Sequence, residues 1–180
     1  MTVSITYFVH GTTTDNEKGL ATGWNQGELS ETGKQQAVKL GELTSGENFD
    51  VVFCSDLKRA VDSANLAFGK KYKIITDKRL RECNYGERSG LSSIKPDEMK
   101  AHVDQPFPGG ESYRDVEKRV VEFVEFLKNN FSGKHVATVA HQGPQLALEV
   151  ICNHLSWTDA ITSDWRRVGK WQPGWKYIIN

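Results

Sequence analysis

The sequence has 180 residues, in which 23 lysines and arginines balance 23 aspartates and glutamates, so that the formal net charge is zero. A chain without net charge has no general attraction for nucleic acid or a membrane surface, and we expect neither partner. The length suits one domain, residues 1–180, with a single core. The three cysteines are odd in number and lack the close pairing of a zinc motif, which indicates reduced thiols. No signal peptide or membrane span is visible, so we expect a cytoplasmic location.

The first predicted element is a buried strand that ends at a histidine. Residues 3–9 alternate apolar with polar side chains and finish with two apolar ones, and His10 and Gly11 follow. This pattern is typical of a mostly buried strand. The polar segment 12–27 has no hydrophobic period and contains three glycines, so it predicts a loop over the site.

The next segments predict a helix, a strand and a second helix. Ser30 can cap a helix whose buried stripe runs through Ala37, Leu40 and Leu43. Residues 50–54 predict a short strand. The pair Ser55-Asp56 would then cap a helix through Ala60, Ala64 and Ala67.

The middle of the chain contains the longest irregular region. Residues 72–75 predict a third short strand, and residues 77–111 are rich in glycine and proline. A stretch of that length without regular structure usually carries function or a lid, although 96–102 can form a helical turn or two. Ser112 starts the clearest helix, with apolar residues on one face up to residue 127.

The last third predicts a strand, a helix and a hairpin. Residues 135–140 read as a buried strand, and Pro144 suits the first turn of the helix that follows. The tail 164–179 alternates and has Pro173-Gly174 at a turn, which predicts a hairpin at the sheet edge. We expect its tryptophans to serve in packing more than in ligand binding. These are Trp165, Trp171 and Trp175.

Strands that alternate with helices predict an α/β fold, a three-layer sandwich with a mainly parallel central sheet flanked by helices. Ligands of such folds gather at the carboxyl ends of the strands. His10, Ser55 and His141 would therefore share one edge of the sheet.

Attack of a histidine on phosphorus needs a neutral ring nitrogen, donors for the phosphoryl oxygens and an acid for the leaving group. His10 is the candidate nucleophile, and His141 can donate to an anion at a helix N-terminus. Arg59 lies in the first turn of its helix, where the helix dipole disfavours a cation unless an anion is near. The alternative for Arg59 is an ion pair with Asp56 or Asp62.

Glu82 is the candidate acid. Apolar and aromatic neighbours in the segment 80–86 could favour its protonated form. Spacing alone leaves Asp56, Glu28 and Glu111 as alternatives.

Several of these segments together resemble the histidine phosphatase superfamily, in its phosphoglycerate mutase-like branch. That branch opens with Arg-His-Gly-x-Thr, and this chain matches all but the first position. The matching residues follow the family's order along nearly the whole chain. They are His10-Gly11-Thr12-Thr13, Asn16, Leu29-Ser30 with Gly33, Gln36 and Ala37, Ser55 to Ala60, Leu80-Arg81-Glu82 with Gly86 and Gly90, Pro108 to Ser112, Arg119 and His141.

The resemblance implies a phosphatase that needs no metal or organic cofactor. His10 would carry the phosphoryl group, Glu82 would protonate the leaving oxygen, and water activated by Glu82 would release inorganic phosphate from a small phosphorylated metabolite. Arg59 and His141 would hold the phosphoryl oxygens. Asn16 and the backbone amides near Gly11, Thr13 and Gln142 would assist.

Two positions depart from the family pattern. Gln142 stands where glycine commonly follows the second histidine. This departure is mild, because any side chain retains the backbone amide. Val9 replaces the first arginine, whose charge-assisted hydrogen bond contributes about 1.5–3 kcal/mol, so its loss could cost tenfold or more in rate or affinity. The cations that the sequence offers as substitutes are Lys18, Arg79, Arg81 and Arg88.

Three functions fit these residues. The first is a phosphatase, natural or weakened by Val9, whether the valine is native or introduced. The second is a phosphate-binding or regulatory pseudo-phosphatase with little turnover. The third is a phosphoglycerate mutase, which the family's greater mutase length disfavours.

Overall fold

The first strand is buried on both faces because its side chains alternate between two hydrophobic clusters. In the computed structural model, which describes residues 2–170 and 172–180, strand β1 is Val3–Val9. Ile5 and Tyr7 belong to one buried cluster, and Phe8 belongs to the other. β1 therefore lies inside a sheet that is covered on both sides.

Within the described residues, the sheet has five strands in the order β3-β2-β4-β1-β5. β2 is Val51–Cys54, β3 is Ile74–Thr76, β4 is His135–Ala140 and β5 is Trp175–Ile179. The pairs β3-β2, β2-β4 and β4-β1 are parallel, whereas β5 is antiparallel to β1. The prediction of a mainly parallel sheet is confirmed.

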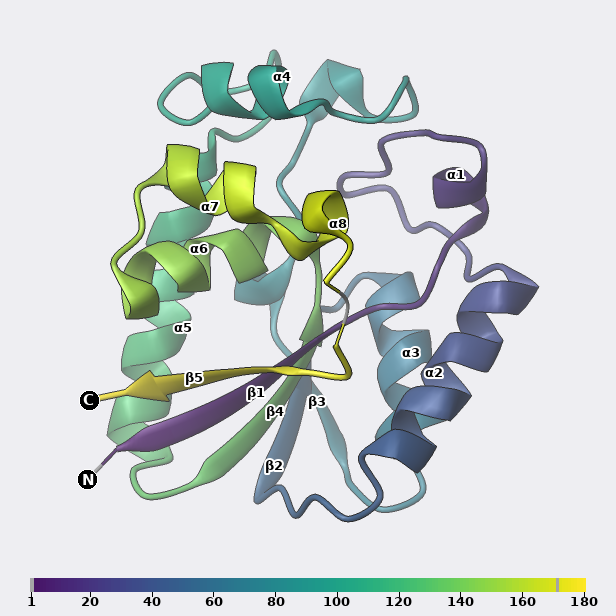
Figure 1. Ribbon diagram of the computed structural model, residues 1–180, viewed down its shortest axis with the longest axis vertical. Helices are drawn as coiled ribbons and strands as arrows, with labels where there is room; N and C mark the ends of the chain where they lie inside the picture. The colour runs from purple at the N-terminus through teal and green to yellow at the C-terminus, as the bar shows by residue number, and fades with distance from the viewer. Residues whose placement is uncertain (1, 171) are drawn as a thin grey trace.

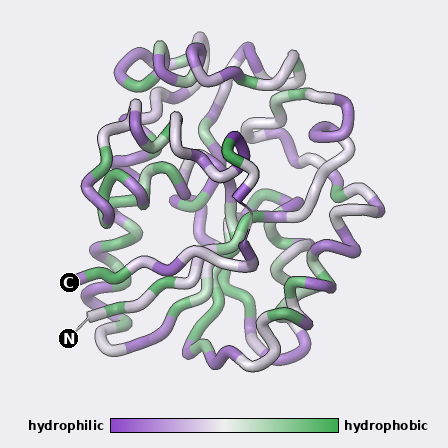
Figure 2. Tube along the Cα trace, in the orientation of Figure 1, coloured by the Kyte–Doolittle hydropathy of each residue, from purple (hydrophilic) through white to green (hydrophobic). Residues whose placement is uncertain are grey.

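Helices cover both faces of this sheet (Figure 1). α2 (Glu31–Leu43) and α3 (Lys58–Phe68) pack against each other on one face. α5 (Tyr113–Asn130) and α6 (Gln142–Asn153) lie on the other. Hydrophobic residues concentrate on the central strands (Figure 2). The predicted three-layer α/β sandwich is confirmed.

Short elements complete the fold around the carboxyl ends of the strands. The predicted helical turn after Pro96 is α4, and the predicted loop 12–27 contains one helical turn, α1. Among the described residues, no helix has the length and apolarity required to cross a membrane. The short elements are α1 (Thr14–Glu17), η1 (Lys78–Leu80), η2 (Gly86–Arg88), α4 (Pro96–Ala101), α7 (Trp157–Ser163) and α8 (Trp165–Val168).

The C-terminal hairpin prediction is wrong, because in the described part of the tail, residues 164–170 and 172–179, only one strand, β5, forms. Its first half is the short helix α8, whose start is capped by the Asp164 side chain accepting from the Arg166 amide. The Trp165 and Trp175 rings stack with centroids 5.0 Å apart, which joins α8 to the sheet edge. Trp171 lies outside the described residues.

Two details of the predicted helices also differ. Ser55-Asp56 does not cap α3, because the cap residue is Leu57 and the Asp56 carboxylate pairs with Arg81 at 2.6 Å. Leu43 is 51% exposed at the end of α2, so the buried stripe of that helix stops before it.

Gly11 lies where the chain after β1 passes tightly against α2. A Cβ atom at Gly11 would be 2.2 Å from the Gly33 carbonyl oxygen, which is backbone and cannot turn away. We expect Gly11→Ala to lower the free energy of unfolding by about 1–3 kcal/mol, measured by urea denaturation. Gly46→Ala is the matched control, since a Cβ there meets nothing within 4 Å. Equal effects of the two substitutions would contradict this packing argument.

Candidate active site

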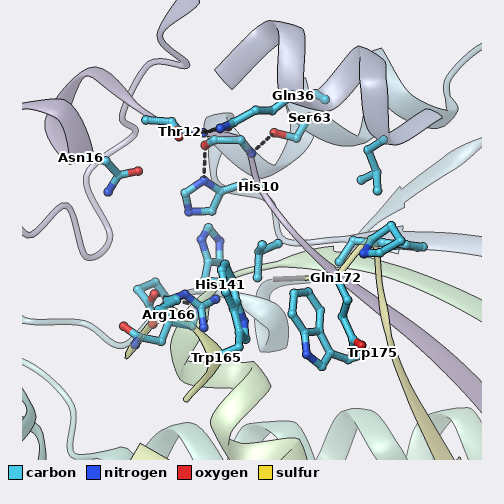
Figure 3. Close-up of a pocket in the computed structure, with 18 residues that line it drawn as sticks. His10, Thr12, Asn16, Gln36, Ser63, His141, Trp165, Arg166, Gln172 and Trp175 are labelled. Carbon is cyan, nitrogen blue, oxygen red and sulfur yellow. Dashed lines mark hydrogen bonds between the residues drawn. The ribbon is translucent and has the colours of Figure 1, made fainter. Parts of the chain in front are cut away.

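A cavity of about 660 Å³ opens at the carboxyl ends of β1 and β4. The two strands are parallel neighbours, and the His10 amide donates to the Ala140 carbonyl at 3.1 Å, so His10 and His141 leave the sheet side by side. Their ring centroids are 5.0 Å apart, and both rings face the cavity (Figure 3). Glu82, Asn16 and Arg166 also line it.

Hydrogen bonding fixes the tautomer of His10. Its Nδ1 lies 2.7 Å from the Gly11 carbonyl oxygen, which can only accept, so Nδ1 carries the proton. Nε2 is then left with its lone pair. Burial, followed by the charge of Arg59, lowers the pKa of His10 to about 3. The imidazole is therefore neutral at physiological pH and its Nε2 can act as a nucleophile.

The lowered pKa of His10 predicts a pH dependence of folding. Its ordinary value is about 6.5, so between about pH 6.5 and 3 the unfolded chain binds more protons than the folded one. His10 then costs stability as the pH falls through this window, by at most about 1.4 kcal/mol per unit. We expect the free energy of unfolding, measured by urea denaturation, to fall less steeply with decreasing pH in His10→Gln than in the parent. An NMR titration of the His10 ring with a midpoint near 6.5 would contradict the assignment.

His141 is fully buried, and neither of its ring nitrogens has a hydrogen-bond partner among the described residues. Burial and then the charges of Arg59 and His10 lower the pKa of His141 well below its ordinary value. The Tyr7 hydroxyl fixes its backbone, donating to the His141 carbonyl at 2.7 Å and accepting from its amide at 2.9 Å. A buried imidazole without partners beside His10 is suited to a ligand that supplies them.

The Glu82 carboxylate is 7% exposed and is held by backbone amides at the start of α6. Oε1 accepts from Cys83 and Gly143, each at 2.8 Å, whereas Oε2 accepts from Gln142 at 3.2 Å. Oε2 thus has the greater unused capacity for hydrogen bonds. The amides predicted to bind an anion at this helix end are occupied by Glu82.

Arg59 is 2% exposed and is not among the residues that line the cavity. Its guanidinium donates to the carbonyls of Gly23 at 2.8 Å and Asn25 at 2.9 Å. The alternative ion pairs do not form, since Asp62 is paired with Lys58 at 2.5 Å and Asp56 with Arg81. The charge of Arg59 nevertheless reaches the site, because it contributes to the lowered pKa of both histidines.

Other groups predicted to bind phosphate already form hydrogen bonds within the protein. The Gly11 amide donates to Ser63 Oγ at 3.0 Å, and the Thr13 amide donates to Asn16 Oδ1 at 3.0 Å. Thr13 caps α1 and does not line the cavity, whereas Asn16 does. The Gln142 side chain is turned to Asp164, to which its Nε2 donates.

None of the cations that the sequence suggested as substitutes for an arginine at position 9 lines the cavity. Lys18 is exposed beyond α1. Arg79 pairs with Asp77, Arg81 with Asp56 and Arg88 with Glu98, each within 2.6 Å.

Sequence reasoning missed several residues of this site. The alternation of residues 3–9 predicts Tyr7 only as a buried strand residue, whereas its hydroxyl also holds the His141 backbone. Ser63 accepts from the Gly11 amide and Asp164 accepts from Arg166. Only the fold shows that these contacts belong to the site. Arg166 carried a weak signal, as a cation between two tryptophans of an aromatic-rich tail, and the structure places it in the cavity. Among the described residues no group of three or more histidines, cysteines or carboxylates could hold a metal ion.

The site thus joins two histidines at the ends of β1 and β4 with Glu82 from the loop after η1, in an α/β sandwich. The family model of the histidine phosphatase superfamily (branch 1) matches residues 7–168. The chain belongs to this superfamily, and the resemblance seen in the sequence is confirmed.

Individual relatives include both mutases and phosphatases. A 2,3-bisphosphoglycerate-dependent phosphoglycerate mutase of Allorhizobium ampelinum is 32% identical over 173 residues, covering 87% of this chain and 82% of the relative. The solved structure of a mycobacterial glucosyl-3-phosphoglycerate phosphatase in complex with VO3 is similar, with a TM-score of 0.77 and 28% identity over 89% of this chain and 86% of that one. An α-ribazole phosphatase from Shigella flexneri shares the fold, with a TM-score of 0.74 and 24% identity over 89% and 83% of the two chains.

Proposed function

We propose that this protein is a metal-independent phosphatase that hydrolyses a small phosphomonoester through a phosphohistidine at His10. The observation that carries the proposal is the state of the His10 ring. Its Nδ1–H is bound to the Gly11 carbonyl, its low pKa keeps it neutral, and it faces His141 in a cavity shared with Glu82. A neutral Nε2 held in one orientation is what attack on phosphorus requires.

The reaction proceeds in two steps. The Nε2 lone pair of His10 forms a bond to phosphorus while the bond from phosphorus to the leaving oxygen breaks, and the proton on Glu82 Oε2 passes to that oxygen. A water molecule then attacks the phosphohistidine and gives a proton to Glu82. The N–P bond breaks, inorganic phosphate leaves, and His10 is neutral again.

The phosphoryl oxygens need donors that are already in place. His141 offers a buried ring whose nitrogens are unused by the described residues, and the Asn16 side-chain amide lines the cavity. Arg59 contributes its charge, which acts on both histidines from outside the cavity wall. Gly11, Thr13 and Gln142 support the pocket through the hydrogen bonds of their own amides.

The rest of the cavity favours an uncharged leaving group. Away from the histidines it is lined by aromatic, aliphatic and amide side chains, among them Trp165, Trp175, Leu40 and Gln36. In the described part of the chain, Arg166 is the only arginine or lysine on its wall. A bisphosphorylated substrate or a phosphorylated carboxylic acid carries a second anion that would need a second cation.

The second candidate is mutase activity, which the names of the curated relatives favour. The two functions differ in where the phosphoryl group goes. The test supplies either p-nitrophenyl phosphate or 3-phosphoglycerate with 2,3-bisphosphoglycerate, and measures released phosphate and 2-phosphoglycerate. We expect phosphate release from the monoester to exceed interconversion of phosphoglycerates. Faster interconversion would establish the mutase instead, and no turnover of either substrate would favour a pseudo-phosphatase.

A further inference from the structure

The side of the cavity next to Val9 is apolar and aromatic. Val9 is the last residue of β1 and packs with Trp175 against the main core cluster. Trp165 and Trp175, whose rings stack, line the same cavity as Val9. The C-terminal segment therefore contributes side chains to the cavity that holds the two histidines.

Arg166 is the cation that this segment delivers. Its side chain is 25% exposed and lines the cavity together with His10 and His141. Figure 3 shows Arg166 next to both His141 and Trp165. Its charge also contributes to the lowered pKa of both His10 and His141, which indicates that the guanidinium acts on both rings.

The guanidinium is held from three sides. Nη1 donates to Asp164 Oδ1 at 2.9 Å, Nη2 donates to Gln145 Oε1 at 3.1 Å, and the group lies 4.4 Å from the centre of the Trp165 ring. Asp164 is 4% exposed and also accepts from Gln142, so this carboxylate is itself fixed. A guanidinium has five N–H donors, and these contacts use two of them. The others are available to an anion.

We propose that Arg166 takes the place of the arginine missing at position 9, as a phosphate-binding side chain held in position by Asp164. The proposal rests on the proposed function, since it concerns the same phosphoryl site. The guanidinium that the motif would place at position 9 is then supplied by a residue more than 150 positions later in the sequence. It also explains how Val9 is tolerated in a site that otherwise retains the superfamily's histidines and glutamate.

The experiment compares the parent with Arg166→Gln, Arg166→Lys and the control Arg167→Gln. Arg167 lies on the same short helix but is exposed and donates to the Ile161 carbonyl, away from the cavity. For each chain the dissociation constant of orthovanadate and the kcat/KM for p-nitrophenyl phosphate are measured, and circular dichroism checks folding. We expect Arg166→Gln to lose about 10- to 100-fold in both quantities. Arg166→Lys should recover part of the loss, and Arg167→Gln should stay within about twofold of the parent.

A second arm introduces Val9→Arg into Arg166→Gln. We expect it to recover vanadate binding, because one guanidinium substitutes for the other at the same anion. If Arg166→Gln binds vanadate as tightly as the parent while the parent turns over substrate, this inference is overturned and the proposed function stands. If the parent binds vanadate through Arg166 but does not turn over, the inference stands and the proposed function fails. No vanadate binding by the parent overturns both.

Discussion

His10→Ala is expected to lower kcat for p-nitrophenyl phosphate by at least about 10³-fold, because it removes the atom that forms the bond to phosphorus. The expected loss is in kcat and not only in KM, since His141, Arg166 and Asn16 still line the cavity. Vanadate should still bind the variant through those residues, although more weakly. Steady-state kinetics at pH 7 measures the loss.

The matched control is His154→Asn. His154 is exposed at the end of α6 and has a left-handed backbone with φ of 58°, which asparagine also adopts readily. This variant should keep the parent rate within about twofold. A His10→Ala rate within tenfold of the parent would contradict the role of His10 as nucleophile.

Glu82→Gln is expected to lower kcat by about 10²- to 10⁴-fold for alkyl phosphates, which need a proton on the leaving oxygen. The loss should be smaller for p-nitrophenyl phosphate, whose leaving group departs as an anion. Glutamine also provides one acceptor oxygen for the three backbone amides that now share the carboxylate, those of Cys83, Gln142 and Gly143. Thermal unfolding therefore has to be measured beside the kinetics.

The dependence on the leaving group separates acid catalysis from damage to the fold. A structural defect lowers the rate of all substrates alike, whereas loss of the acid affects poor leaving groups most. Glu87→Gln, at an exposed position in the same segment, should change neither rate. An equal loss for alkyl and p-nitrophenyl phosphates would contradict the role of Glu82 as acid.

Local sequence patterns were sufficient for the layers of the fold and for the two histidines. β1, β4 and α5 are predicted at nearly their observed bounds, because each has an uninterrupted hydrophobic period that depends on its own residues. The meeting of His10 and His141 follows from the parallel pairing of β1 with β4. Both features are set by short segments and by one topological rule.

The parts that sequence reasoning missed depend on contacts between distant segments. α8 is too short to show a period, and it forms where Asp164 caps it and Trp165 stacks on Trp175. Arg59, which the sequence predicts to hold a phosphoryl oxygen, donates to two carbonyls of the loop before α2, and the sequence alone does not show these contacts. The weak signal around Arg166 does not fix its position, because Gln145, one of its partners, lies 21 residues earlier.

Mapping the phosphorylated residue tests the central claim most directly. The protein is mixed with a ³²P-labelled phosphomonoester, quenched in alkali, digested and examined by mass spectrometry. The account predicts an acid-labile label on Nε2 of His10, absent from His10→Ala and longer lived in Glu82→Gln, where the water that releases phosphate lacks its base. A label on any other residue, or release of phosphate by His10→Ala at the parent rate without a labelled intermediate, would contradict it.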